Sequence, residues 1–213
     1  MNKRILFLLP LITLIACSPS KNGESLKPPY SDSDTSSEEP LDPALYGTKT
    51  VVFKGASNRT GMTQGSQLGD DKFNTAITSL FNEDDPGFLT NLSGASCSFQ
   101  PVYDSSVTSL TIGTGSKAGN IIFTLSKDIV KLDFVLQTYH KYVEYTQTYS
   151  FDKDAEITVE GQHYDMSIAS VDNPPENKNE SINLANPKKT IEFSNSDAAH
   201  RVYVHSITFY YEK

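Results

Sequence analysis

The feature that most constrains the fold is a succession of short β-type stretches between residues 96 and 212, which turn-forming residues separate. The predicted strands are SCSFQPVY, SLTIGTG, NIIFTLS, IVKLDFVLQTYHKYV, AEITVEG, HYDMSIAS, KTIEFSN and RVYVHSITFYYE. In the longest stretch apolar and polar residues alternate, as in Leu132, Asp133 and Phe134. This alternation is typical of an antiparallel strand with one buried and one solvated face, so the chain is predicted to be mainly β.

One earlier stretch has the period of a helix. In DDKFNTAITSLF, apolar residues recur at i, i+3, i+4, i+7 and i+8 from Phe73 to Phe81, and Asp70 or Asp71 is placed to cap the first turn. DDPG then ends the helix, and TKTVVFKG before it is predicted as a further strand. Together these elements predict an antiparallel two-sheet sandwich of jelly-roll or Greek-key type, with one short helix near 71–81.

Three local features refine this picture. EGQH lies between two predicted strands and favours a hairpin turn. In RVYVHSITFYY the apolar residues change parity, which predicts a β-bulge near His205–Ser206. Residues 172–187, DNPPENKNESINLANP, form a long polar insertion whose composition favours a disordered loop.

The N-terminal residues have the pattern of an export signal. Lys3 and Arg4 precede an apolar core from Ile5 to Ile15, which has a length typical of a secretory signal (~7–15 residues) and is too short to span a bilayer (~18 residues). LIAC at 14–17 resembles the lipobox of bacterial lipoproteins. This resemblance implies that residues 1–16 are a lipoprotein signal peptide and that Cys17 carries diacylglyceryl lipid. Two acyl chains suffice for stable anchoring, so the expected location is the extracytoplasmic face of the cell membrane.

The composition changes again after the cysteine. Residues 17–46 are rich in Ser, Pro, Asp and Glu and are predicted to be a disordered tether. Residues 47–213 then form the β-sandwich domain, which is long enough to bury a core without disulfides. With Cys17 lipidated, Cys97 has no partner, and we interpret it as a small buried packing residue.

The charge of the chain excludes one class of partner. The formal net charge is −8, and removal of Lys3 and Arg4 with the leader makes it −10. No basic cluster occurs, so nucleic acid is excluded as a partner. An acidic surface favours neutral or basic partners instead.

Two stretches of the predicted sandwich carry a further resemblance. SLTIGTGSKAGNIIFTLS and RVYVHSITFYYEK resemble a small β-sandwich module of surface and secreted proteins from low-GC bacteria and mollicutes. The similarity covers about residues 90 to 213. It implies an extracellular domain and carries no assigned chemistry.

Motifs for catalysis, metal binding or cofactor binding are weak. GTGSKA at 113–118 fits the bare dinucleotide-binding pattern, but a predicted strand follows where that site needs a helix, so we interpret it as a glycine-rich turn. The four histidines lack metal-ligand spacing, and DKDAE at 152–156 is interpreted as a solvated strand entry rather than a calcium site. We therefore predict no cofactor, no metal and no catalytic residue.

The best candidate for ligand binding is a tyrosine-rich segment. Its four tyrosines are Tyr139, Tyr142, Tyr145 and Tyr149. Exposed tyrosine rings are a common platform for sugars or proteins, although tyrosine is also a favoured strand residue. Two functional hypotheses follow: a tethered, non-enzymatic module that binds a glycan or a protein, and an extracellular hydrolase whose active-site residues no motif identifies.

Overall fold

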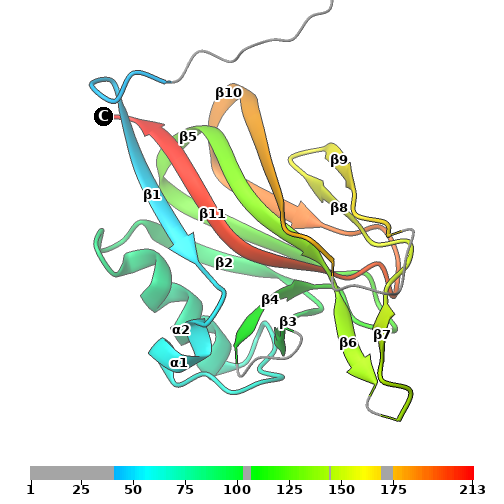
Figure 1. Ribbon diagram of the computed structural model, residues 1–213. Coiled ribbons are helices and arrows are strands. Elements are labelled where there is room, and N and C mark those ends of the chain that lie inside the picture. The colour runs from blue at the N-terminus through cyan, green and yellow to red at the C-terminus, as the bar shows by residue number, and fades with distance from the viewer. Residues whose placement is uncertain (1–40, 103–106, 144, 169–174) are drawn as a thin grey trace, which may run out of the picture. The chain divides into compact units, whose positions relative to one another are not determined.

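The structure is a computed structural model that describes residues 41–102, 107–143, 145–168 and 175–213 (Figure 1). The chain divides into two units, 1–39 and 40–213, and every described residue belongs to the second. The predictions for the signal peptide, Cys17 and most of the tether therefore lie outside the described residues. No helix in the described ranges combines the length and apolar character needed to cross a membrane.

The described residues form two helices and eleven strands. The helices are α1 (Ala56–Thr60) and α2 (Asp71–Asn82), and the strands are β1 (Tyr46–Val52), β2 (Leu89–Ala95), β3 (Cys97–Pro101), β4 (Thr108–Ile112), β5 (Asn120–Thr138), β6 (His140–Val143), β7 (Thr148–Phe151), β8 (Glu156–Val159), β9 (Gln162–Asp165), β10 (Lys178–Ser194) and β11 (Val202–Glu212). The fold is mainly β, as the sequence predicts.

Nine strands belong to one curled antiparallel sheet, in the order β3-β4-β11-β5-β10-β8-β9, with β1 paired to β11 and β2 paired to β5. Strands β6 and β7 form a separate hairpin. This arrangement differs from the predicted two-sheet sandwich, because backbone hydrogen bonds connect these nine described strands into one sheet. Strands β5 and β10 pair along most of their length, and both pass from one half of the sheet to the other (Figure 1).

The curl arises where the β5–β10 ladder is irregular. The register shifts between Asn183 and Lys188 and again before Thr190. Irregularities of this kind bend a strand and increase its twist. The N-terminal half of β5 pairs with β2, and its C-terminal half pairs with β11. The two halves face each other across the core, where the rings of Phe134 and Phe193 lie 5.6 Å apart.

Helix α2 packs into this core. It covers the residues where the apolar period predicts a helix, and Asp70 is its N-cap residue. Its buried residues are Phe73, Ala76, Ile77, Leu80 and Phe81. The Phe81 ring lies 4.8 Å from that of Phe123 on β5 and 5.6 Å from that of Phe209 on β11, so the helix contacts both halves of the sheet.

Two local predictions are confirmed and one is wrong. The register of β11 shifts between Val204 and Ser206, which is the expected bulge, and β8 and β9 form the expected hairpin. Residues 178–187 are not a loop, because they form the first half of β10, and Lys178 to Asn183 pair with β5. The polar residues Asn179, Ser181 and Asn183 of this half alternate with the buried Ile182 and lie on the exposed side of the strand. Residues 172–174 of the predicted insertion lie outside the described residues.

Candidate functional site

The solvent side of β1, β11, β5 and β10 forms a mainly polar surface, here called the polar sheet face. Figure 1 shows these four strands side by side. Strand register aligns their outward-facing residues in rows that cross the strands. One row is Thr50, Thr208, Asp133 and Ser181, and the next is Val52, Ser206, Val135 and Asn179. The alternation of β5 predicts that Asp133 faces solvent, but the sequence does not indicate which strands flank it.

Asp133 is the centre of a hydrogen-bond network on this face. Its Oδ1 accepts a hydrogen bond of 2.7 Å from Ser181 Oγ, and its Oδ2 accepts one of 2.5 Å from Tyr210 Oη. Lys131 Nζ lies 3.5 Å from Asp133 Oδ1 and 5.5 Å from the centre of the Tyr210 ring. The hydrogen bond to Asp133 is the main cause that raises the pKa of Tyr210 to about 12. The carboxylate is therefore fixed in position while 38% of its side chain remains exposed.

A shallow trough of about 270 Å³ lies between the two rows. Its walls are Thr208, Asp133 and Ser181 on one side and Ser206, Val135 and Asn179 on the other. The side chains of Asn179 and Ser206 have no hydrogen-bond partner among the described residues. Free hydroxyl and amide groups beside a fixed carboxylate can bind a ligand that carries many hydroxyl groups.

The predicted tyrosines occupy different environments. The ring of Tyr139 is half-buried, with the Arg201 guanidinium 3.6 Å from its centre and the Tyr203 ring 5.2 Å away. The half-buried Tyr149 ring lies 5.9 Å from that of Phe151. Tyr145 is 90% exposed at the turn between β6 and β7.

The side chain of Tyr142 lies outside the described residues. Of the other three tyrosines, only Tyr145 presents its ring fully to solvent. The tyrosine segment remains a predicted binding site.

The DKDAE segment is occupied by contacts within the protein. Asp152 accepts hydrogen bonds of 2.6 and 2.9 Å from the Arg201 guanidinium and one of 3.1 Å from the Arg201 backbone N–H. Glu156 accepts a hydrogen bond from Ser196. Across the described ranges, no group of His, Cys, Asp and Glu side chains is arranged to hold a metal ion.

Glu156 also bears on the hydrolase hypothesis, because two histidines approach it. Its carboxylate lies 3.5 Å from His200 Nδ1 and 3.6 Å from His163 Nδ1. The hydrogen bond from Ser196 is the main cause that lowers the pKa of Glu156. A serine hydrolase needs its hydroxyl hydrogen-bonded to an imidazole. Here the hydroxyl donates to the carboxylate instead, so the cluster contains no activated nucleophile.

A second Ser–His arrangement lies in the core, and sequence reasoning missed it. His205 Nδ1 is 2.9 Å from Ser109 Oγ, and His205 Nε2 is 2.9 Å from Gln137 Oε1. The exposed fractions of Ser109, His205 and Gln137 are 0%, 3% and 8%. Burial is the main cause that lowers the pKa of His205 to about 3. A substrate cannot reach this group, so its role is structural. The sequence signal that pointed to this group is the predicted bulge near His205–Ser206, where the His205 side chain is buried.

The other singled-out motifs are also structural. Cys97 is buried, as predicted, and burial raises the pKa of its thiol to about 12, so the thiol is unreactive.

GTGSKA forms the turn between β4 and β5, and no helix follows it in the described chain. The backbone N–H of Gly119 donates a 2.6 Å hydrogen bond to Asn195 Oδ1. A dinucleotide-binding site at this turn is therefore excluded.

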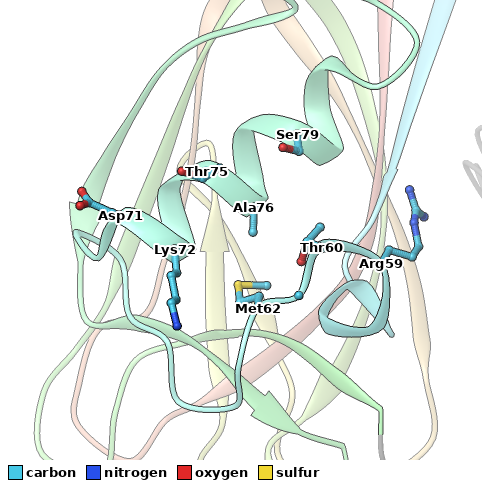
Figure 2. Close-up of a pocket in the computed structure, with 9 residues that line it drawn as sticks. Arg59, Thr60, Met62, Asp71, Lys72, Thr75, Ala76 and Ser79 are labelled. Atoms are coloured by element: carbon cyan, nitrogen blue, oxygen red, sulfur yellow. The ribbon is translucent and has the colours of Figure 1, made fainter.

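A larger hollow of about 560 Å³ is an open groove between α1 and α2 (Figure 2). Figure 2 shows Thr75, Ala76 and Ser79 on α2 and Met62 on the facing segment after α1. Its volume suits a small molecule, but its polar groups do not converge. Arg59 forms an ion pair with Glu83 beyond the groove. The polar sheet face is therefore the better candidate surface.

Comparisons with known proteins give only distant similarities. No family model matches the sequence, and no curated protein matches it. A solved mutant of the family 29 carbohydrate binding module CBM29-2 has a TM-score of 0.35 and 10% identity, over 78% of this chain and 92% of that one. Another CBM29-2 mutant, complexed with mannohexaose, has a TM-score of 0.35 and 11% identity, over 77% and 92%. A structure described as carbohydrate binding module family 29 has a TM-score of 0.35 and 11% identity, over 77% and 89%. Similarity of this degree assigns neither a family nor a ligand.

Proposed function

We propose that this chain is a non-enzymatic binding module and that its polar sheet face binds a glycan. The observation that carries the proposal is the trough beside Asp133, where the side chains of Ser206 and Asn179 have no hydrogen-bond partner in the described chain. Glycans offer hydroxyl groups that donate and accept hydrogen bonds. A fixed carboxylate accepts from such hydroxyls at little entropic cost, because its orientation is already set.

The character of the exposed surface favours a glycan over a protein partner. The centres of protein interfaces are apolar and rich in aromatic residues. In the described part of the chain, the exposed large apolar residues are Leu45 in the turn before β1, Val52 at the end of β1 and Tyr145 in the turn between β6 and β7. They form no common patch. A protein partner that docks through an apolar centre therefore has no matching surface on these residues.

Binding to a glycan array and a proteomic pull-down test this function. The full chain, purified in mild detergent, is compared with Asp133→Ala and with Asp128→Ala, an exposed aspartate on the same strand. We expect Asp133→Ala to weaken glycan binding at least tenfold and Asp128→Ala to leave it unchanged. Tyr145→Ala tests the tyrosine segment in the same assay. Loss of binding with Tyr145→Ala alone would move the site to the β6–β7 hairpin. Capture of a protein and no glycan would contradict the proposal.

We also propose that the module is attached to the extracytoplasmic face of a bacterial membrane through lipid on Cys17. The lipobox-like LIAC behind a short apolar leader supports this. The intact mass of membrane-extracted protein should show loss of residues 1–16 and a gain of two or three acyl chains. A Cys17→Ala variant should be absent from the membrane fraction. If this variant stays in the membrane fraction, the lipid anchor is wrong.

A further inference from the structure

The direction of the trough constrains the shape of its ligand. Its two walls are rows of side chains that each cross β10, β5 and β11, so the trough runs across the strands. Its floor includes Phe134 and Glu180, which lie opposite each other in the register between the two rows. The Phe134 side chain is buried in the core, because successive side chains of a strand point to opposite faces. The floor is therefore backbone, and a ligand must lie flat in it.

The length of the trough follows from strand spacing. Neighbouring strands lie about 4.8 Å apart, so three strands span roughly 10 Å and four span roughly 15 Å. Thr50 and Val52 continue the two walls onto β1. A hexopyranose in an extended chain advances by about one strand spacing, so each sugar meets one strand. An unbranched chain of about three to four sugars fills the trough, whereas a branch would meet a wall.

The charges of the trough favour an uncharged ligand. Asp133 is the one wall residue with a formal charge, and Lys131 lies 3.5 Å from its carboxylate. The other charged lining residue, Glu180 at the floor, is also an acid. The trough therefore has no free cation to hold an acidic sugar, and the whole chain carries a net charge of −8.

We infer that the trough binds an unbranched, uncharged oligosaccharide of about three to four hexoses that lies across the strands. This inference rests on the proposed glycan-binding function. Asp133 accepts hydrogen bonds from sugar hydroxyls through its remaining lone pairs, and Asn179 and Ser206 bond the sugar from the opposite wall. Val135 and Val52 give the C–H face of a sugar an apolar contact.

Titration calorimetry with a set of oligosaccharides tests the ligand class. The full chain is titrated with neutral linear oligosaccharides from one to six sugars, including mannohexaose, and with oligo-uronic acids of equal length. Affinity should rise up to three or four sugars and then level off, and the uronic acids should bind at least tenfold more weakly. Equal affinity for monosaccharide and tetrasaccharide, or a preference for uronic acids, would overturn the inference.

Filling the trough tests its position. Ser206→Tyr places a ring in the trough and removes no side-chain hydrogen bond within the described chain, whereas Ser93→Tyr makes the same change on the exposed strand β2. We expect at least a tenfold loss of affinity with Ser206→Tyr and less than a twofold change with Ser93→Tyr.

Asn179→Ala, on the exposed side of β10, serves as a second trough variant if Ser206→Tyr does not fold. Binding that both trough variants leave unchanged would overturn the inference and leave the proposed function standing. If the wild type binds no glycan at all, the proposed function itself fails.

Discussion

At the scale of single residues, His205 shows how burial selects a protonation state. Its Nε2 donates to Gln137 Oε1, because Gln137 Nε2 donates to Pro175 O at 2.7 Å and so turns Oε1 toward the ring. Nδ1 then carries no hydrogen and lies 2.9 Å from Ser109 Oγ, so Nδ1 and Val204 O, which accepts from the same hydroxyl at 2.8 Å, share its single hydrogen. The neutral imidazole keeps the hydrogen bond to Gln137 and avoids a buried charge, which is costly.

This arrangement predicts a loss of stability in mild acid. The pKa of His205 falls from 6.5 to about 3 on folding. Below pH 6.5 the unfolded chain therefore binds a proton that the folded chain does not, and this residue lowers the free energy of unfolding by about 1.4 kcal/mol per pH unit. Between pH 6 and pH 4 its share is about 2–3 kcal/mol. Chemical denaturation at several pH values should show a shallower pH dependence for His205→Gln than for wild type.

The exposed His163 gives the matched control for this experiment. Its side chain is 57% exposed and lies outside the buried network, so the pH profile of His163→Gln should be steeper than that of His205→Gln between pH 6 and pH 4. Parallel pH profiles for wild type and His205→Gln would show that His205 is not the group that carries the acid sensitivity.

At the scale of elements, amphipathic elements could be predicted from sequence and polar or short ones could not. The period of residues 71–81 predicts a helix, and α2 lies there because its apolar face packs between the halves of the sheet. Strand β2 was missed because LTNLSGA buries only Leu89 fully and has no apolar alternation. The first half of β10 was predicted as a loop because its composition is polar. Pairing with β5 on one side orders both segments, and pairing partners cannot be derived from local composition.

The glycine-rich turn between β4 and β5 makes a direct element-scale prediction. A Cβ on Gly119 would lie 2.3 Å from Gly113 N and 2.6 Å from Ser96 O, whereas a Cβ on Gly115 would have nothing within 4 Å. Because backbone atoms cannot yield as side chains do, Gly119→Ala should lower the free energy of unfolding by about 1–3 kcal/mol. Gly115→Ala should change it by less than about 0.5 kcal/mol. Urea denaturation of both variants measures this, and equal stabilities would contradict the role given to this turn.

At the scale of the whole molecule, the predicted strands lie mostly in the right places but their assembly differs from the prediction. NIIFTLS and IVKLDFVLQ are separated by polar residues that suggest a turn between two sheets. In the structure β5 passes straight through this segment, with Ser126, Lys127 and Asp128 exposed. The polar sheet face is a product of this assembly, since its rows combine residues from four strands. Sequence reasoning could place Asp133 in solvent, but it could not bring Ser181, Thr208 and Ser206 beside it.

The same assembly predicts an independent domain. Among the described residues, the buried hydrophobic core runs from Val51 to Phe209, and Cys97 is a free buried thiol. A fragment of residues 41–213 should therefore melt within about 2 °C of the full chain, with or without reductant. Differential scanning calorimetry of the two proteins checks this. A melting temperature lowered by more than 5 °C in the fragment would show that residues 1–40 contribute to the fold.

Hydrogen–deuterium exchange of the full chain shows whether the ligand binds on the polar sheet face. The chain is exchanged with and without a saturating neutral glycan identified on the array, and peptides are resolved by mass spectrometry. We expect slower exchange in peptides that cover 131–137, 178–183 and 204–210, with no change in 56–62 and 71–83 beside the helix groove. Protection confined to the helix groove or to the β6–β7 hairpin, with the three strand peptides unchanged, would contradict binding on this face.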